Sequence, residues 1–255
     1  MLTVELGQRH SVRSYSLKPL SESILRNLKA EITDINTHYS GMHFQLVTND
    51  DSAFRGIRKS YGFFRNPRNY VAAVVDKSFP HVLKKAGYCA EQIVMKAVEL
   101  GLGTCFVGGT FDASSVPVQI RADWKLLFVV LIGYAEEDKR RAMDRFITKI
   151  VHRKEPDWQS LYVDKGVPLE TALIKQPALE TALKVLLTAP SALNKRPVRL
   201  TLDRENKVIP FLPTSAKDRE IDLGIAIWNL EAAIGDALRF QHDEYEETYQ
   251  PAEHL

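Results

Sequence analysis

The chain has 255 residues, of which 45% are hydrophobic and 26% charged, a mix that is typical of globular proteins and argues against disorder. Its formal net charge of +2 is too small to indicate nucleic acid as a partner. The longest strongly apolar run, residues 126–132, is too short to span a bilayer, and no apolar signal region opens the chain. We therefore expect a soluble cytoplasmic protein.

Side chains that bind metals or act as catalysts form no familiar pattern in this sequence. The two cysteines, Cys89 and Cys105, fall in a predicted helix and a predicted buried strand, which indicates a reducing compartment. The seven histidines show no ligand spacing, so we expect no metal site. The sequence contains no G-x-S-x-G, H-E-x-x-H or C-x-x-C motif, so we predict no catalytic side chain.

The first informative stretch is RHSVRSY, residues 9–15. Arg9, Ser11 and Arg13 alternate along it, and an extended backbone would point all three to one side. Two guanidinium groups and a hydroxyl on one side suit a phosphate, since the arginines supply forked charged donors. The alternative is a solvated polar edge.

A helix is predicted next, with Ser21 as its N-cap and its end near Ile35. A strand is predicted at residues 42–48, and the near-continuous apolar run 70–75 predicts a strand covered on both faces. Between them lies a polar, basic loop that contains aromatic residues. Tyr61 in this loop is a candidate for covering a ligand, although such aromatics more often belong to a core.

Residues 85–109 predict a helix followed directly by a short strand. Apolar residues recur at helical spacing, and Gly101 and Gly103 are expected to end the helix. Residues 104–107 read as a buried strand, after which Gly108 and Gly109 would let a ligand approach the backbone closely. The alternative is an ordinary helix–strand unit that ends in a flexible turn.

Another buried strand is predicted at residues 125–134, and residues 135–153 are strongly basic. A solvated helical face is the simpler explanation of that basic run, and a contribution to an anion site is the other. Periodicity lapses over residues 154–168, which indicates a boundary.

The second half begins with a predicted helix at residues 169–188. The stretch APSALNKRP, residues 189–197, then predicts a turn whose polar groups can face a ligand. Paired strands are predicted at residues 198–203 and 207–212, and a helix at residues 222–238.

The two halves resemble each other in pattern. The stretch that begins at Gly224 matches the stretch that begins at Gly87, and residues 183–203 match residues 28–48. The second half lacks a counterpart of the arginine motif and of the strand with two glycines, whereas the first half lacks a counterpart of the Pro-Ser-x-x-Asn turn. Chance similarity between two helix–turn–strand units is the alternative.

Together these motifs resemble the nitroreductase family of flavin enzymes over most of the chain. RHSVRSY resembles the family's Arg-x-Ser-x-Arg phosphate motif, residues 87–109 its central helix and glycine pair, and FVVLIGYAEE its late strand. APSALNKRP resembles its Pro-Ser-x-x-Asn-x-Gln-Pro turn. In ordinary members that turn follows the N-terminal motif by a few tens of residues, whereas here it arrives only at Pro190. This order is similar to the minority branch called putative TM nitroreductases, in which one chain imitates the usual homodimer.

The resemblance implies an α+β fold, a nitroreductase-like α/β/α sandwich built from two diverged half-repeats. Residues 1–155 would form the half with the phosphate motif and glycine pair, and residues 166–255 the half with the turn. The two halves would form one compact unit and a monomer with an internal pseudo-twofold axis.

The resemblance also implies where FMN would bind. It assigns Arg9, Ser11 and Arg13 to the phosphate, together with Arg141 or Arg145, and Gly108 and Gly109 to the flavin ring; Tyr61 joins them as a covering residue, and Pro190, Ser191 and Asn194 would meet the ring from the other half. Arg196 replaces the family's usual glutamine and Val198 its usual aromatic residue, which implies a different substrate face.

The implied activity is hydride transfer from NAD(P)H through FMN to a small oxidised acceptor such as a nitroaromatic or a quinone. In such chemistry the cofactor carries the redox step and no catalytic side chain is needed. Two alternatives stay open: a flavin-binding or sensing protein without turnover, and a scaffold that has lost flavin and binds another ligand or partner. The sequence neither names the acceptor nor chooses between NADH and NADPH.

Overall fold

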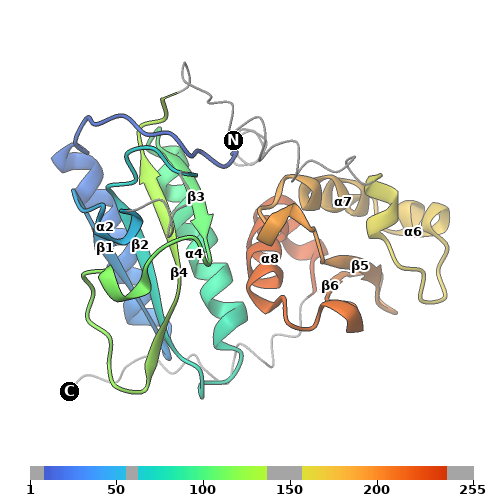
Figure 1. Ribbon diagram of the computed structural model, residues 1–255. Coiled ribbons are helices and arrows are strands. Elements are labelled where there is room, and N and C mark those ends of the chain that lie inside the picture. Colours follow the sequence, from blue (N-terminus) through green and yellow to red (C-terminus); the bar gives the residue numbers. More distant parts are fainter. Residues whose placement is uncertain (1–8, 56–62, 137–156, 240–255) are drawn as a thin grey trace. The chain divides into compact units, whose positions relative to one another are not determined.

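The computed structural model describes residues 9–55, 63–136 and 157–239 (Figure 1). Of these, residues 9–55, 63–82 and 92–136 form one compact unit, here called the sheet unit. Residues 83–91 and 157–239 form a second, here called the hairpin unit. None of the helices in these ranges combines the length and apolarity that a bilayer crossing needs.

The sheet unit contains a four-stranded antiparallel sheet in the order β1-β2-β4-β3. Its strands are β1 (Met42–Val47), β2 (Tyr70–Asp76), β3 (Gly103–Val107) and β4 (Trp124–Gly133). β2 is a central strand, and its first six residues are all buried, which explains its near-continuous apolar sequence. The strands predicted at residues 42–48, 70–75, 104–107 and 125–134 are thus confirmed to within a residue at each end.

Helix α2 (Glu22–His38) begins where the sequence predicts, because the Ser21 hydroxyl accepts the backbone N–H of Ile24 at 3.4 Å. It ends three residues later than expected. Near its end the Asn36 side chain bonds both the N–H and the carbonyl of Phe44, at 2.8 and 2.9 Å. This pair of bonds ties α2 to strand β1.

Helix α4 (Val82–Glu99) ends as predicted at Gly101, which has a φ of +76°. Gly103, also expected to end the helix, is instead the first residue of β3. A Cβ at Gly103 would overlap the Val12 side chain, so this glycine makes room for a neighbour rather than for a helix stop. Cys89 in α4 and Cys105 in β3 are both buried and are not bonded to each other.

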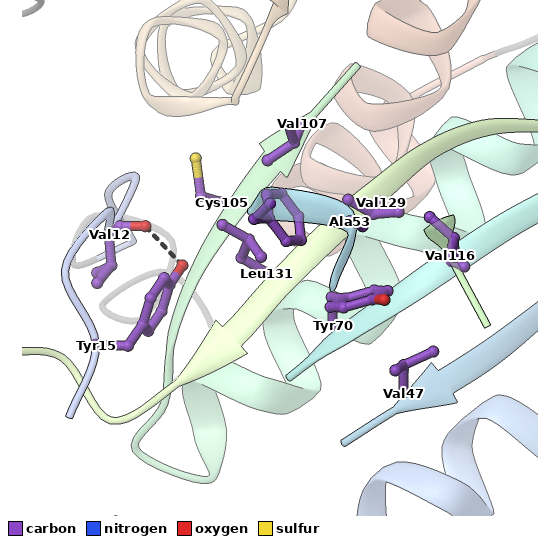
Figure 2. Close-up of a cluster of buried hydrophobic side chains, with 12 residues drawn as sticks. Val12, Tyr15, Val47, Ala53, Tyr70, Cys105, Val107, Val116, Val129 and Leu131 are labelled. Carbon is purple, nitrogen blue, oxygen red and sulfur yellow. Dashed lines mark hydrogen bonds between the residues drawn. The ribbon is translucent and has the colours of Figure 1, made fainter. Parts of the chain in front are cut away.

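One hydrophobic cluster of the sheet unit lies against one face of the sheet (Figure 2). Two short 3-10 helices, Ser52–Phe54 and Ala113–Ser115, lie by this face, and Phe54 meets Tyr70 edge to face with ring centroids 5.5 Å apart. Val12 and Tyr15 from the N-terminal segment belong to the same cluster. The segment that carries the arginine motif is therefore anchored in the core.

Residues 157–239 of the hairpin unit form three α-helices and a two-stranded antiparallel sheet, and residues 83–91 of α4 belong to the same unit. Its elements are α6 (Leu169–Lys175), α7 (Ala178–Thr188), β5 (Arg199–Leu202), β6 (Val208–Phe211) and α8 (Glu220–Ile234). The prediction of a single helix over residues 169–188 is wrong. The chain forms two helices, α6 and α7, because Pro177 between them lacks the N–H that a continuous helix needs. The helix expected to reach residue 238 ends at Ile234, because Gly235 turns away with a φ of +45°.

Within the hairpin unit, residues 83–91 of α4 contact α8 at two glycines. A Cβ on Gly87 would overlap the carbonyl of Ile221, and a Cβ on Gly224 would overlap the carbonyl of Lys84. Each glycine thus faces the residue three positions before the other. Buried hydrogen bonding adds to this contact, since Asn229 Nδ2 donates to Glu91 Oε1 at 2.9 Å.

Replacing either glycine at this helix contact should destabilise the fold. An alanine within a helix normally gains about 1 kcal/mol over glycine. We nevertheless expect Gly87→Ala and Gly224→Ala each to lower the free energy of unfolding by about 1–3 kcal/mol, because backbone carbonyls block the new methyl group. Urea denaturation measures the change.

The matched control is Gly108→Ala, where a Cβ meets no atom within 4 Å. Its free energy of unfolding should stay unchanged or rise by up to about 1 kcal/mol. A stability of the Gly87 and Gly224 variants equal to or above that of the control would contradict the packing described here.

Candidate functional site

The N-terminal motif lies beside the start of β3. The Val12 N–H donates to the Thr104 carbonyl at 2.8 Å, and Ser11 and Thr104 form a parallel bridge. On its other side the segment exchanges backbone bonds with Arg65, which donates to the Arg13 carbonyl at 2.8 Å and accepts from the Tyr15 N–H at 3.0 Å. The extended backbone predicted for this motif is thereby confirmed.

Apolar side chains anchor one side of this segment. Val12 is buried against Gly103, and the buried Tyr15 donates its hydroxyl to the Val12 carbonyl at 2.6 Å (Figure 2). Burial raises the pKa of Tyr15 well above its usual value, so the phenol stays a donor. Residues 9, 11 and 13 are half-buried, whereas Val12 between them is buried.

The glycine pair follows the other end of the same strand. Gly108 and Gly109 are exposed, neither has a positive φ, and a Cβ on either would meet no atom within 4 Å. Neither the backbone conformation nor the packing of the chain therefore requires glycine here. Gly108 is the fourth residue after Thr104, which corresponds to about 13 Å of extended chain. The arginine motif thus lies beside the start of β3, and the glycine pair follows its end directly.

The predicted Pro-Ser-x-x-Asn turn lies in the hairpin unit, directly after α7. Its 3-10 segment Ala192–Asn194 contains Leu193 and Asn194, both with a φ of +54°, and Arg196 follows with a φ of +46°. Left-handed backbone costs non-glycine residues about 1 kcal/mol each, and such strain gathers at functional sites. The sequence did not indicate this conformation, because only asparagine among the three tolerates it readily.

Side-chain hydrogen bonds hold the turn in this shape. The Ser191 hydroxyl accepts the Arg196 N–H at 2.9 Å, and Asp222 Oδ1 accepts the Ala192 N–H at 2.9 Å. Arg196 Nε in turn donates to the Leu187 carbonyl at 3.0 Å, in the last turn of α7. The arginine that replaces the family's glutamine is 9% exposed and caps this helix end.

Asp222 is a residue that the sequence analysis missed. It is 5% exposed, and its Oδ2 atom has no hydrogen-bond partner in the described structure. Burial raises its pKa, against the lowering effects of the Ala192 N–H and the Arg219 charge. Near it Pro190, Ser191 and Arg196 line a cavity of about 10 Å³, room for about one water molecule. An acidic residue in a first helical turn ordinarily indicates only a favourable helix dipole, so no sequence signal pointed to the turn.

Three of the predicted site residues, Tyr61, Arg141 and Arg145, lie outside the described residues. The others fall into two sets. The sheet unit holds the arginine motif and the glycine pair, and the hairpin unit holds Pro190, Ser191 and Asn194. That the two sets serve one ligand stays a prediction. In the described part of the chain, no three cysteine, histidine or acidic side chains are grouped so that they could hold a metal ion.

The family model described as Putative TM nitroreductase matches residues 2–234. The chain belongs to this family. Membership agrees with the resemblance of the motifs and makes this chain one of a family of nitroreductases, which are oxidoreductases. No curated protein matches the chain.

Among solved structures, a putative nitroreductase from Thermotoga maritima MSB8 is similar with a TM-score of 0.58 at 18% identity, over 91% of this chain and 82% of that one. This likeness shows the mixed α/β nitroreductase-like fold. An FMN-dependent nitroreductase from Clostridium difficile R20291 matches 59% of this chain and 97% of its own, at 19% identity and a TM-score of 0.43. A putative nitroreductase in complex with FMN from Desulfovibrio desulfuricans matches 57% and 94%, at 16% identity and a TM-score of 0.41.

The buried carboxyl group of Asp222 should make stability depend on pH. Because its pKa is raised in the folded state, folding favours the protonated form, and this stabilisation is lost as pH rises from about 4 through the folded pKa. Asp222→Asn keeps an acceptor for the Ala192 N–H but cannot ionise. We expect the free energy of unfolding of this variant to fall less than that of the natural chain over this pH range in urea denaturation.

The matched control is Asp236→Asn, which removes an exposed carboxylate from the hairpin unit. This control should follow the pH profile of the natural chain. If Asp222→Asn also follows that profile, the carboxyl of Asp222 does not titrate as its burial implies.

Proposed function

We propose that this chain is a cytoplasmic, flavin-dependent oxidoreductase that transfers hydride from NAD(P)H through FMN to a small oxidised acceptor such as a nitroaromatic or a quinone. Family membership supports the class of activity. One observation supports FMN as the cofactor: the arginine motif lies beside the start of β3, and two glycines with open space around them follow its end.

The residues of the sheet unit fit FMN in charge and in shape. FMN carries an anionic phosphate at the end of a ribityl chain and a flat ring at the other end. Arg9 and Arg13 supply forked cations and Ser11 a hydroxyl at the start of β3, which suits the phosphate. Beyond the end of β3, Gly108 and Gly109 leave open the space that a Cβ would fill, which suits a ring lying against the backbone.

When bound, FMN would supply the hydride chemistry. The task of the chain is to hold and to orient. Backbone N–H groups at Gly108 and Gly109 would donate to the polar edge of the ring, and the arginine motif would neutralise the phosphate. The strained turn would present Pro190, Ser191 and Asn194 in a fixed conformation, because its bonds to Asp222 and to α7 are made within the protein. No side chain is assigned a proton-transfer role.

We further propose that the chain imitates a family homodimer with two diverged half-repeats, residues 1–155 and 166–255. The glycine contact between α4 and α8 supports this. The sequence repeat matches Gly87 with Gly224 and hence Lys84 with Ile221, and the contact is reciprocal in these same pairs. A twofold relation produces such reciprocity, since residue i meets j and the counterpart of j meets the counterpart of i.

From this half-repeat arrangement we infer a monomer that binds one FMN. Only the first half carries the arginine motif and the glycine pair, and only the second carries the Pro-Ser-x-x-Asn turn. The opposite combination would be framed by Ile35, Asn36 and Tyr39 and would offer no arginine pair to a phosphate. Asn36 is in any case committed to the backbone of Phe44.

Anaerobic reduction tests the proposed activity. The full chain is loaded with FMN and desalted, and NADH or NADPH is then added without oxygen. Both steps of the proposal should be visible: loss of the yellow flavin absorbance, and its return when a nitroaromatic or a quinone is added. Retained colour without bleaching would indicate a flavin-binding protein without turnover, and failure to retain FMN would contradict the cofactor assignment.

Removing a guanidinium from the motif should weaken FMN binding. We expect Arg13→Ala to cost about 1.5–3 kcal/mol of binding free energy, the usual size of a charged hydrogen bond, in isothermal titration. Arg26→Ala is the control. Arg26 lies on α2 with its side chain 73% exposed, so this variant removes the same charge elsewhere on the sheet unit. An unchanged affinity for FMN in both Arg9→Ala and Arg13→Ala would contradict the assignment of this motif to the phosphate.

A further inference from the structure

A groove of about 130 Å³ lies on the sheet unit, on a part of the chain that the proposed flavin chemistry does not use. Strands β1, β2 and β4 and the loop before β4 line it, with residues His43, Gln45, Val74, Gln119, Arg121 and Trp124. His43 pairs with Val74 across β1 and β2, and Trp124 pairs with Asp76 across β4 and β2. Their side chains therefore share one face of the sheet.

Arg121, one of the lining residues, is held beside Trp124 by its own turn. Its carbonyl accepts the Trp124 N–H at 3.0 Å, and its guanidinium carbon lies 5.0 Å from the centre of the Trp124 ring. This cation–π contact places the guanidinium beside the indole ring, and because Arg121 is exposed its N–H groups are open to a ligand. Across residues 9–55, 63–136 and 157–239, no carboxylate lies within ion-pair distance of Arg121.

The other groups of the groove are neutral or already committed. Gln45 donates to the Gln119 carbonyl at 2.8 Å and accepts the Gln119 N–H at 3.0 Å. Val74 is 1% exposed and supplies an apolar floor. The neighbouring acid Asp76 is not a lining residue, and its Oδ1 atom accepts two hydrogen bonds from Ser78, at 2.9 and 2.7 Å.

His43 adds a polar ring without a fixed charge. Partial burial, with the Arg121 charge second, lowers the pKa of His43, so its neutral form prevails at neutral pH. The lining of the groove therefore carries a single positive charge at that pH, together with one aromatic ring and one aliphatic floor.

We propose that this groove binds a small organic carboxylate, with the anion on Arg121 and an apolar body between Trp124 and Val74. A guanidinium edge matches a planar carboxylate in bidentate geometry, and one positive charge matches one negative charge. The volume is close to that of a cavity of about 150 Å³, which holds a benzene ring. The proposal rests on these contacts alone and not on the proposed flavin activity.

Benzoate and benzamide are suitable probes, because they have the same shape and only benzoate is charged. Binding to the full chain is followed by the NMR shift of the Trp124 indole N–H, assigned with Trp124→Phe. Benzoate should shift this signal saturably, and benzamide should bind at least about tenfold more weakly. Arg121→Gln should lose at least about tenfold in benzoate affinity, whereas Arg26→Gln, which removes an exposed arginine on α2, should lose none.

Several outcomes would overturn the proposal. One is the absence of a saturable benzoate shift up to about 50 mM. Others are equal binding of benzoate and benzamide, or unchanged benzoate affinity in Arg121→Gln. Because Arg121 is exposed, its variant should fold normally, and thermal unfolding checks this independently of binding. Loss of FMN binding has no bearing on these readouts, so the two proposals fail separately.

Discussion

The contact between Val12 and Gly103 sets the position of the arginine motif. β3 is an edge strand, and the N-terminal segment covers the beginning of its open edge through the bond from the Val12 N–H to the Thr104 carbonyl. Gly103 leaves room for the Val12 side chain, and the Tyr15 hydroxyl donates a hydrogen bond to the Val12 carbonyl. Because Val12 and Tyr15 are fixed in the core, the backbone that carries Arg9, Ser11 and Arg13 is fixed beside the start of β3, about one strand length from the glycine pair.

In the hairpin unit, side-chain hydrogen bonds fix the conformation of the Pro-Ser-x-x-Asn turn. Its turn accepts left-handed backbone at three non-glycine residues, which would favour other conformations in isolation. The hydrogen bond that Asp222 accepts from the Ala192 N–H and the bond that Arg196 donates to the Leu187 carbonyl offset that cost, since a bond to a charged group is worth about 1.5–3 kcal/mol. The side chains that the family resemblance assigns to the flavin ring are thus presented by a braced segment rather than by a loose loop. Bracing of this kind lowers the ordering cost of binding a ligand.

Local pattern was sufficient wherever one element determines its own structure. The apolar runs predicted β2 and β4, Ser21 predicted the start of α2, and the alternation at residues 9–13 predicted an extended segment. Local pattern failed where the partner lies far along the chain. Nothing near Asp222 indicates a turn thirty residues earlier, and nothing near Gly103 indicates Val12. At Pro177 the local signal was present but was not used. Helical periodicity on both sides favoured one continuous helix, although a proline inside a helix predicts a break.

We propose that one chain binds one flavin with residues from both of its chemically different halves. Light scattering combined with flavin absorbance on the FMN-loaded full chain tests it most directly, because it gives the molar mass of the particle and its flavin content together. The account predicts a monomer that carries one FMN. Two flavins per chain, or a dimer that is required for flavin to stay bound, would contradict it.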